Sequence, residues 1–370
     1  MKVLHLCAGN LYGGVERIVA QCAESRLLDR SSEPSFAVCF DGRLAQQVRA
    51  TGAACEVLGP VRVSRPHTVV RARRTLSDLL DRQRPDVAIT HSCWTHGLAA
   101  PVVAKHGISA VPWIHDRLSG RTWVERWASR STPPAVICNS RYTADSVASV
   151  FPSVRTHVVY APVAGGSAMT VGDRQQLRRF HEAADETCVV LIASRFEAWK
   201  GHHDLIESLA SLSAPWQLWI AGEVQKPGER AYDRALRELA AKHQVQDRVR
   251  FLGHSDDVPA LMAASDLLCQ PNTDPEPFGL VFVEALYAGL PVVTTKFGGA
   301  AEIVTDACGV LVPPGDRHAL VETLGALLSD PRRRHALGSA GPARAAALCD
   351  PSNRLAELSS VLAGAGVPCH

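Results

Sequence analysis

The chain has 370 residues, of which 46% are hydrophobic and 21% charged, and its formal net charge is +2 at pH 7. These values exclude a largely disordered chain and give no overall charge that favours nucleic acid as a partner. The length exceeds that of most single-core domains, so two domains are expected.

Neither the N-terminus nor the cysteines indicate export or a metal site. The apolar run at the N-terminus is too short for a signal peptide, and no stretch of about 18 apolar residues is present to span a bilayer. Eleven cysteines are scattered without a Cys-x-x-Cys pair, which favours free thiols over disulfides or zinc. We therefore expect a soluble, cytoplasmic protein.

Strand-like runs alternate with helical stretches along the whole chain. In the first half, strands are expected at residues 3–7, 35–40, 86–90, 111–115 and 135–139. In the second half, they are expected at residues 188–194, 217–222, 249–252, 267–270 and 291–294, with a helix at 231–243 among the intervening segments. This alternation predicts an α/β fold whose parallel sheets carry helices on both faces.

A glycine- and proline-containing segment without periodicity, residues 160–172, is expected to link the two halves. The predicted domains are residues 1–165 and 166–351. Leucine or valine at positions 355, 358, 361 and 362 forms a helical stripe that needs a surface to cover. We expect a C-terminal helix at about 352–366 to dock on the first domain.

The first candidate site is the loop Gly-Asn-Leu-Tyr-Gly-Gly-Val-Glu at residues 9–16, which follows a strand and precedes a helix expected near Val15. Glycine allows close approach to the backbone, and a helix N-terminus offers unpaired N–H groups to an anion. The amides near Gly13 and Gly14 are therefore candidates for binding phosphate. An ordinary tight turn is the alternative, and the spacing differs from the Gly-x-Gly-x-x-Gly of dinucleotide-binding enzymes.

The second candidate site is a pair of cations, Arg195 and Lys200, at the carboxyl end of the strand expected at residues 188–194. Doubly wound sheets bind ligands at that edge, and both side chains are suited to neutralising a diphosphate. The alternative is two solvated surface cations.

The third candidate site is Glu-Pro-Phe-Gly-Leu-Val-Phe-Val-Glu-Ala, which begins at Glu276 and has a second carboxylate at Glu284. Carboxylates accept hydrogen bonds from vicinal hydroxyls, here those of a sugar and a ribose. A helix-capping role for Glu276 and a buried salt bridge for Glu284 are the alternatives. Phe278 and Phe282 lie at helical spacing and are expected in the core.

In this order and spacing, the three motifs resemble glycosyltransferase family 4. Ala-Gly-Leu-Pro-Val-Val at residues 288–293 and Gly-Gly-Ala-Ala-Glu-Ile-Val at residues 298–304 extend the resemblance over nearly the whole chain. It implies the GT-B fold, in which two Rossmann-like domains face each other across a cleft. It also implies transfer of a hexose from a nucleotide diphosphate sugar, with UDP-glucose favoured, and retention of the anomeric configuration.

Carried over by position, the resemblance implies a role for each candidate residue. The catalytic residues would be Glu276, His115, Arg195 and Lys200, with Glu276 on the sugar hydroxyls, His115 near the C6 hydroxyl and the two cations on the diphosphate. The remaining donor-binding residues would be Gly13 and Gly14 near the diphosphate, Gly253 and His254 at the base, the backbone of Phe278, Gly279 and Leu280 along the sugar and phosphates, and Glu284 at the ribose.

Two departures bear on the mechanism. The chain has Tyr-Ala-Pro-Val at residues 160–163, where the family often has an asparagine, and it lacks the Asp-x-Asp that holds Mg²⁺ in other sugar transferases. Cations and backbone amides can take the place of a metal, so we expect no metal and no cofactor besides the nucleotide sugar.

The acceptor is not identified by the sequence beyond a hydroxyl on a glycan, a lipid or a small metabolite. Seven arginines between positions 62 and 84 predict a basic surface for an anionic acceptor or for peripheral contact with an anionic membrane; a solvated helix face is the alternative. They are Arg62, Arg65, Arg71, Arg73, Arg74, Arg82 and Arg84. A nucleotide-sugar epimerase and a non-catalytic nucleotide-sugar-binding protein remain alternatives for the whole chain.

Overall fold

The computed structural model describes residues 1–166, 169–255 and 257–365. The chain forms two compact units. Unit 1 contains Met1–Ala164 and the C-terminal residues from Cys349 on, and unit 2 contains Gly165–Leu348. The sequence predicted the first boundary between the units one residue later, after residue 165, and the second boundary three residues later, after residue 351.

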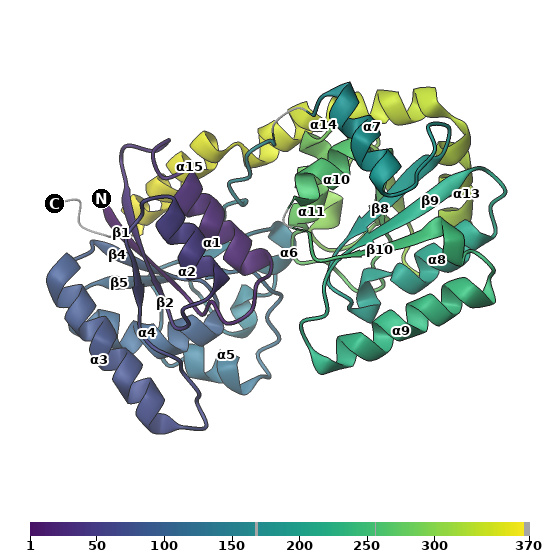
Figure 1. Cartoon of the computed structure of the whole chain (residues 1–370). Helices are drawn as coiled ribbons and strands as arrows, with labels where there is room; N and C mark the ends of the chain where they lie inside the picture. Colours follow the sequence, from purple (N-terminus) through teal and green to yellow (C-terminus); the bar gives the residue numbers. More distant parts are fainter. Residues whose placement is uncertain (167–168, 256, 366–370) are drawn as a thin grey trace. The chain divides into compact units, whose positions relative to one another are not determined.

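Unit 1 contains a seven-stranded sheet in the order β3-β2-β1-β4-β5-β6-β7 (Figure 1). All neighbouring strands run parallel. The strands are β1 Lys2–Cys7, β2 Glu33–Val38, β3 Cys55–Val57, β4 Val87–Thr90, β5 Ser109–Ile114, β6 Val136–Cys138 and β7 Thr156–Val158. Because the order reverses between β1 and β4, the carboxyl ends of these two strands flank a position where such sheets bind ligands.

The helices of unit 1 cover both faces of its sheet. They are α1 Gly14–Glu24, α2 Arg43–Ala50, α3 Pro66–Gln83, α4 Cys93–Lys105, α5 Trp123–Ala128, α6 Arg141–Ala144, the 3₁₀ helix η1 Val147–Ser149 and α15 Pro351–Gly364. Apolar side chains of α3 and α4 pack against β1, β2 and β4 in one buried cluster.

The C-terminal helix α15 belongs to unit 1 and contacts its first strand and helix. Leu355, Leu358 and Leu362 are buried and line a small cavity together with Val3 of β1 and Cys22 of α1. The hydroxyl of Ser359 also donates to the Asp29 carboxylate. The apolar stripe seen in the sequence is therefore the face of α15 that unit 1 buries.

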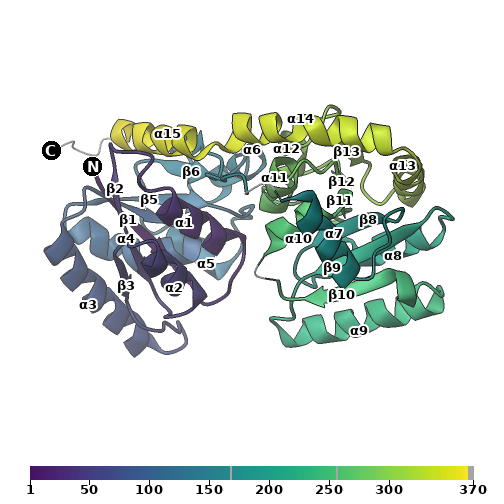
Figure 2. The same cartoon turned by 45° about the horizontal axis from the view of Figure 1, so that its top comes forward.

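Unit 2 contains a six-stranded parallel sheet in the order β10-β9-β8-β11-β12-β13. In Figure 2 its labels run in this order, with β13 uppermost. The strands are β8 Cys188–Ala193, β9 Trp216–Ala221, β10 Val249–Gly253, β11 Leu267–Gln270, β12 Val292–Thr295 and β13 Gly309–Val312. Its order reverses between β8 and β11, as that of unit 1 does between β1 and β4.

The helices of unit 2 surround this sheet in the same doubly wound manner. They are α7 Val171–Phe180, η2 Ala198–Lys200, α8 His202–Ala210, α9 Pro227–Lys242, η3 Gln246–Arg248, α10 Val258–Ala264, α11 Leu280–Tyr287, α12 Ala300–Ile303, α13 Arg317–Ser329 and α14 Pro331–Cys349. Leucines of α8, α9 and α13 pack with β8 and β9 in the main core cluster. Two Rossmann-like units of this kind are the α/β architecture that the sequence predicted.

Three strands were not predicted, and all three are sheet edges: β3, β7 and β13. Each has three or four residues, and β3 and β7 are only partly buried. Edge strands bury fewer side chains, so β3 and β7 lack the apolar run that marks a central parallel strand. The strand β13, Gly-Val-Leu-Val, does have such a run, and the sequence analysis missed it.

Besides shifts of one or two residues at strand ends, two predicted boundaries differ for a local structural reason. Gly172 was assigned to the linker but lies in α7, which begins at Val171 after a Thr170 hydroxyl cap. The helix predicted at 231–243 begins at Pro227, because the Glu229 carboxylate accepts the N–H groups of Gln225 and Lys226 and so fixes an earlier start. Linker residues 167–168 and the predicted helix end at 366 lie outside the described residues.

The cysteines and the helices can be compared with the expectations from the sequence. All ten cysteines in the described ranges are free, and nine of them are buried. Within residues 1–166, 169–255 and 257–365, no helix has both the length and the apolar character needed to cross a membrane.

Candidate functional site

The main polar cluster of unit 2 is built around an ion pair between Lys200 and Glu276. The Lys200 ammonium donates to Glu276 Oε2 at 2.6 Å, and the two side chains are only 12% and 13% exposed. Lys200 lies at the end of η2, after β8, and Glu276 lies in the loop after β11. The two charges that the sequence assigned to phosphate and to sugar are therefore in direct contact.

Amide side chains hold the Glu276 carboxylate in place. Gln270 and Asn272 each donate to Glu276 Oε2 at 3.3 Å, and Gln270 also donates to Asn272 Oδ1 at 2.9 Å. The backbone of Glu276 forms a bridge with Gly298, and its carbonyl accepts the N–H of Gly299 at 2.7 Å. Glu276 is thus fixed by both its side chain and its main chain, so it is not a mobile helix-capping carboxylate.

Gly201 allows the lysine loop to lie against the glutamate loop. Its φ is +80°, and a Cβ atom there would lie 2.0 Å from the Pro271 carbonyl oxygen, so only glycine fits. The N–H of Thr273 donates to the carbonyl of Trp199 at 2.8 Å, which joins the same two loops. The Lys200 ammonium also lies 3.9 Å from the centre of the Trp199 ring, a cation–π contact.

Arg195 has a different carboxylate partner. Its guanidinium lies 3.1 Å from Glu197, whose other oxygen lies 3.9 Å from the Lys226 ammonium. The Arg195 side chain is 33% exposed. Neither predicted cation is therefore an isolated solvated charge, and the alternative of two solvated surface cations is wrong.

The segment after Glu276 turns sharply into α11. Phe278 and Phe282 are buried in the core, as predicted. Gly279 has φ +107°, and a Cβ atom there would lie 2.4 Å from the Phe282 ring. Leu280 is the first residue of α11, and Glu284 lies half-buried on the same helix. The amides at the start of this helix therefore follow closely after Glu276 in the chain.

Gly253 and His254 lie at the carboxyl end of β10. Gly253 has φ +68°, and its carbonyl accepts the N–H of Gly222 at 2.9 Å. His254 Nδ1 lies 3.6 Å from Glu223 Oε1. The candidate residues of unit 2 thus follow β8, β10 and β11 at one edge of the sheet, where doubly wound sheets bind ligands.

In unit 1, the glycine-rich loop opens α1 as predicted, with helix start Gly14. The N–H of Gly13 donates to the Glu16 carboxylate at 3.1 Å, so this amide caps its own helix. Gly14 is exposed. Of the two glycines assigned to phosphate, Gly14 is the better candidate, because the Gly13 amide is engaged and faces a negative charge.

His115 follows β5 directly and is 4% exposed. Its Nε2 atom lies 3.1 Å from His91 Nδ1, and Asn139 Nδ2 donates to its carbonyl at 3.1 Å. Burial lowers the pKa of His115 to about 3, so the imidazole is neutral at physiological pH.

Sequence reasoning did not single out the residues that support these groups. They are Gln270, Asn272 and Glu197 in unit 2 and His5, His91 and Asn139 in unit 1. Apart from His5, which lies within β1, they share one signal: a polar residue at the end of an apolar strand or in the loop that follows it. That signal is too common by itself to assign a role.

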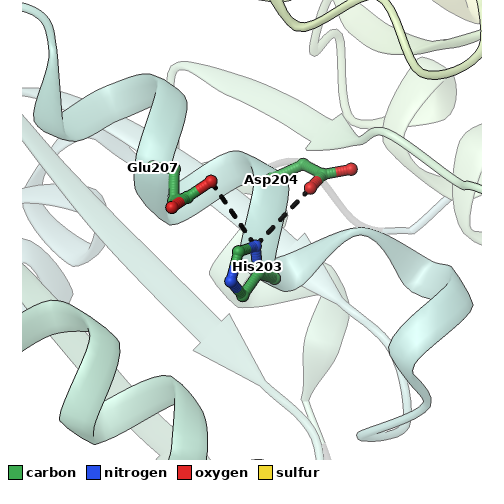
Figure 3. A group of neighbouring side chains, drawn as sticks. All are labelled: His203, Asp204 and Glu207. Atoms are coloured by element: carbon green, nitrogen blue, oxygen red, sulfur yellow. Dashed lines mark ion pairs between the residues drawn. The ribbon is translucent and has the colours of Figure 1, made fainter.

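A separate cluster of metal-ligand types lies on α8, where His203 Nδ1 is 3.6 Å from both Asp204 and Glu207 (Figure 3). The Glu207 oxygen that faces His203 also lies 2.7 Å from the Arg317 guanidinium. A metal ion there would face this cation, and the His203 side chain is 52% exposed. The cluster is better explained as a surface ion network, and metal independence stays a prediction.

Comparisons with known protein families cover both units. The model for "Glycosyltransferase Family 4" matches residues 12–164, and the model for "Glycosyl transferases group 1" matches residues 173–344. The first match falls within unit 1 and the second within unit 2. The chain belongs to the family 4 glycosyltransferases and has their GT-B fold.

Individual relatives agree with this assignment. A GDP-mannose-dependent monoacylated α-(1-6)-phosphatidylinositol monomannoside mannosyltransferase of Corynebacterium glutamicum is 35% identical over 47% of this chain and 46% of its own. Glycogen synthase of Mycobacterium tuberculosis is 29% identical over 72% of this chain and 66% of its own. The chain thus spans between about half and two thirds of the length of these relatives.

Among solved structures, HepE of Anabaena in complex with UDP and glucose has a TM-score of 0.85. It is 26% identical and covers 98% of this chain and 100% of its own. A structure of HepE with UDP-glucose matches equally well. The similarity to WaaG, at 20% identity and a TM-score of 0.73, shows the shared fold alone.

The buried histidines predict loss of stability in acid. Burial lowers the pKa of His115 to about 3 and those of His5 and His96 to about 4, below the ordinary 6.5. Below pH 6.5 the unfolded chain therefore binds protons that the folded chain does not. The contribution of the neutral imidazoles to the free energy of unfolding is fully present above pH 6.5. At pH 5, each histidine has lowered the free energy of unfolding by at most about 2 kcal/mol.

Urea unfolding at pH 7.5 and pH 5 tests this prediction. The variant His115→Phe should lose about 2 kcal/mol less than the wild type between these pH values. The variant His67→Phe, at an exposed position of the same unit, should lose as much as the wild type. An unchanged pH dependence in His115→Phe would contradict the burial of a neutral imidazole.

Proposed function

We propose that this protein transfers a hexose from a UDP-sugar, with UDP-glucose favoured, to a hydroxyl acceptor with retention of the anomeric configuration. The observation that carries the proposal is the Lys200–Glu276 pair, which lies with Arg195 in the loops at the carboxyl edge of the unit 2 sheet. In this pair a cation suited to binding a diphosphate contacts a carboxylate suited to accepting hydrogen bonds from sugar hydroxyls. The HepE complexes with UDP and UDP-glucose support the choice of base and sugar.

In this proposal Lys200 and Arg195 stabilise the negative charge that develops on the departing nucleoside diphosphate. Lysine has three N–H donors, so its bond to Glu276 leaves others for phosphate oxygens. Glu276, fixed by Gln270 and Asn272, accepts hydrogen bonds from the hexose hydroxyls. The donor-binding roles of Gly253, His254 and Glu284 follow from the family resemblance.

The proposed reaction is a front-face substitution. The bond between the anomeric carbon and the phosphate oxygen loosens first, and the acceptor oxygen attacks from the side of the leaving group. A phosphate oxygen of the leaving group takes the acceptor proton, so no protein nucleophile takes part. We propose that these cations and backbone amides act without a metal ion.

The donor site can be tested by calorimetric titration with UDP, GDP and ADP in EDTA. UDP should bind most tightly, and the variant Arg195→Ala with Lys200→Ala should bind it at least about 100-fold more weakly. Each charge-assisted hydrogen bond contributes about 1.5 to 3 kcal/mol, which accounts for this loss. The variant Arg237→Ala with Lys242→Ala removes the same charges from α9 and should bind UDP like the wild type.

The outcome of this titration also separates the alternatives. Absence of nucleotide binding by the folded protein would overturn the transferase proposal, and tighter binding of GDP would replace the proposed donor. Conversion of UDP-glucose to an epimer without an acceptor would indicate an epimerase. Binding without any turnover of donor would indicate a nucleotide-sugar-binding protein.

The arginine-rich segment at residues 62–84, which includes α3, supports an anionic partner for unit 1. Arg73 is engaged within the fold, since it donates to the carbonyls of Gly97 and Leu98, and Arg82 pairs with Glu56. The other arginines of the segment are exposed, and Val63 and Val70 are exposed among them: Arg62, Arg65, Arg71, Arg74 and Arg84. We propose that this surface binds the negative charge of an acceptor or of a lipid surface.

Co-sedimentation with vesicles distinguishes these two sources of charge. If the partner is a membrane, the protein should pellet with vesicles containing phosphatidylserine at low salt and remain in solution with neutral vesicles. The variant Arg65→Glu with Arg74→Glu should lose this binding, whereas Arg332→Glu with Arg333→Glu in unit 2 should retain it. No pelleting at low salt would exclude the membrane and leave a soluble anionic acceptor.

A further inference from the structure

Three buried histidines form a continuous hydrogen-bonded chain across unit 1. His5 lies in β1, His91 directly follows β4 and His115 directly follows β5, and these are neighbouring strands. Their exposed fractions are 3%, 1% and 4%. His5 Nδ1 lies 3.0 Å from His91 Nε2, and His91 Nδ1 lies 3.1 Å from His115 Nε2.

Aromatic packing fixes the orientation of all three rings. His91 stacks on His5 and on His115, with interplanar angles of 20° and 5°. Trp113 stacks on both His91 and His115, and Phe36 stacks on His5. A ring flip at any one position would therefore disturb its neighbours as well as its hydrogen bond.

The protonation states along this chain are coupled. A neutral imidazole has one N–H and one lone pair, and each N···N hydrogen bond needs one of each. If His91 donates from Nδ1, His115 accepts at Nε2 and carries its own hydrogen on Nδ1. His91 then accepts at Nε2 from His5. In the opposite arrangement all three rings carry hydrogen on Nε2, so the three histidines share one tautomer.

His115 has one remaining ring nitrogen, Nδ1. It is buried, and no hydrogen-bond partner for it is found among the residues that the structure describes. Among the described residues, the hydrogen bond between His115 Nε2 and His91 Nδ1 is therefore what determines whether His115 Nδ1 carries a hydrogen or presents a lone pair. A polar group that forms a hydrogen bond with His115 Nδ1 therefore interacts with the tautomer that the bond to His91 imposes.

We propose that His91 is a positioning residue that holds His115 in one tautomer for contact with a hydroxyl of the donor hexose, and that His5 completes the chain. This inference rests on the proposed function and on the family resemblance, which implies that His115 lies near the C6 hydroxyl of the hexose. It adds two residues that have no direct contact with the sugar. Their effect on transfer would pass through the orientation and tautomer of His115.

Nitrogen NMR of ¹⁵N-histidine-labelled protein at pH 7.5 tests the coupling without donor or acceptor. His115 and His91 should each show a single tautomer, and it should be the same in both. The variant His91→Phe keeps a stacked ring but removes both hydrogen bonds, so His115 should show a mixture of tautomers or the other form. Different tautomers in the wild type, or an unchanged His115 in His91→Phe, would overturn the proposal.

The matched control is His96→Phe. His96 is equally buried in unit 1 and also makes two ring hydrogen bonds, to Thr90 and to the Ser131 carbonyl, but it is not hydrogen-bonded to the other three. This variant should lose comparable stability and leave the His115 spectrum unchanged. A change of the His115 tautomer in His96→Phe would show that the effect reports general loosening and would overturn the proposal.

Release of UDP from UDP-glucose, with water as the acceptor, gives the functional readout. His91→Phe should lower kcat about tenfold, by analogy with the lower end of what loss of a partner that orients a metal-bound histidine costs, with an unchanged Kd for UDP. His91→Asn should retain most of the activity, because its amide can bond to His115 Nε2 from the position of Nδ1. Equal loss in both variants would indicate a purely structural role and would overturn the proposal.

Failure of the proposed function is distinguishable from failure of this inference. A wild-type protein that neither binds UDP nor releases it from UDP-glucose would overturn the transferase proposal. The NMR result would still decide whether the histidines are coupled.

Discussion

The contact between Lys200 and Glu276 joins two loops that are 76 residues apart in the chain, and the arrangement of the unit 2 site depends on it. Both charges are largely buried, so removing either one would leave the other with an uncompensated cost of desolvation. Gly201 permits the approach, and Gln270 and Asn272 bring amide donors to the same carboxylate oxygen. One ion pair therefore sets the spacing between the group suited to phosphate and the group suited to sugar.

The two units obtain their polar sites from the same feature of a doubly wound sheet. In unit 2 the important side chains follow β8 and β11, and in unit 1 they follow β4 and β5 or lie in β1. Parallel strands place their carboxyl ends at one edge, so residues distant in sequence meet there. The apolar cores of both units hold these ends in place.

The sequence predicts the parts of this structure that leave a local signal. Central strands appear as apolar runs, and the family motifs bring Arg195, Lys200 and Glu276 to one region. The edge strands β3 and β7 leave no such run. Nor does the spacing show that Lys200 pairs with Glu276 while Arg195 pairs with Glu197, because that depends on how two loops pack. The chain from His5 to His115 depends on the strand order β1-β4-β5, which is not the order of the sequence.

The most direct test of the central claim is to measure the affinities of the wild type and Glu276→Gln for UDP and for UDP-glucose. If Glu276 binds the sugar while Lys200 binds the phosphate, the variant should lose about tenfold in affinity for UDP-glucose, which corresponds to about 1.4 kcal/mol. Its affinity for UDP should be unchanged or higher, because Lys200 is released from its partner. An equal loss of affinity for both ligands, or no loss for either, would contradict the proposed division of roles between Lys200 and Glu276.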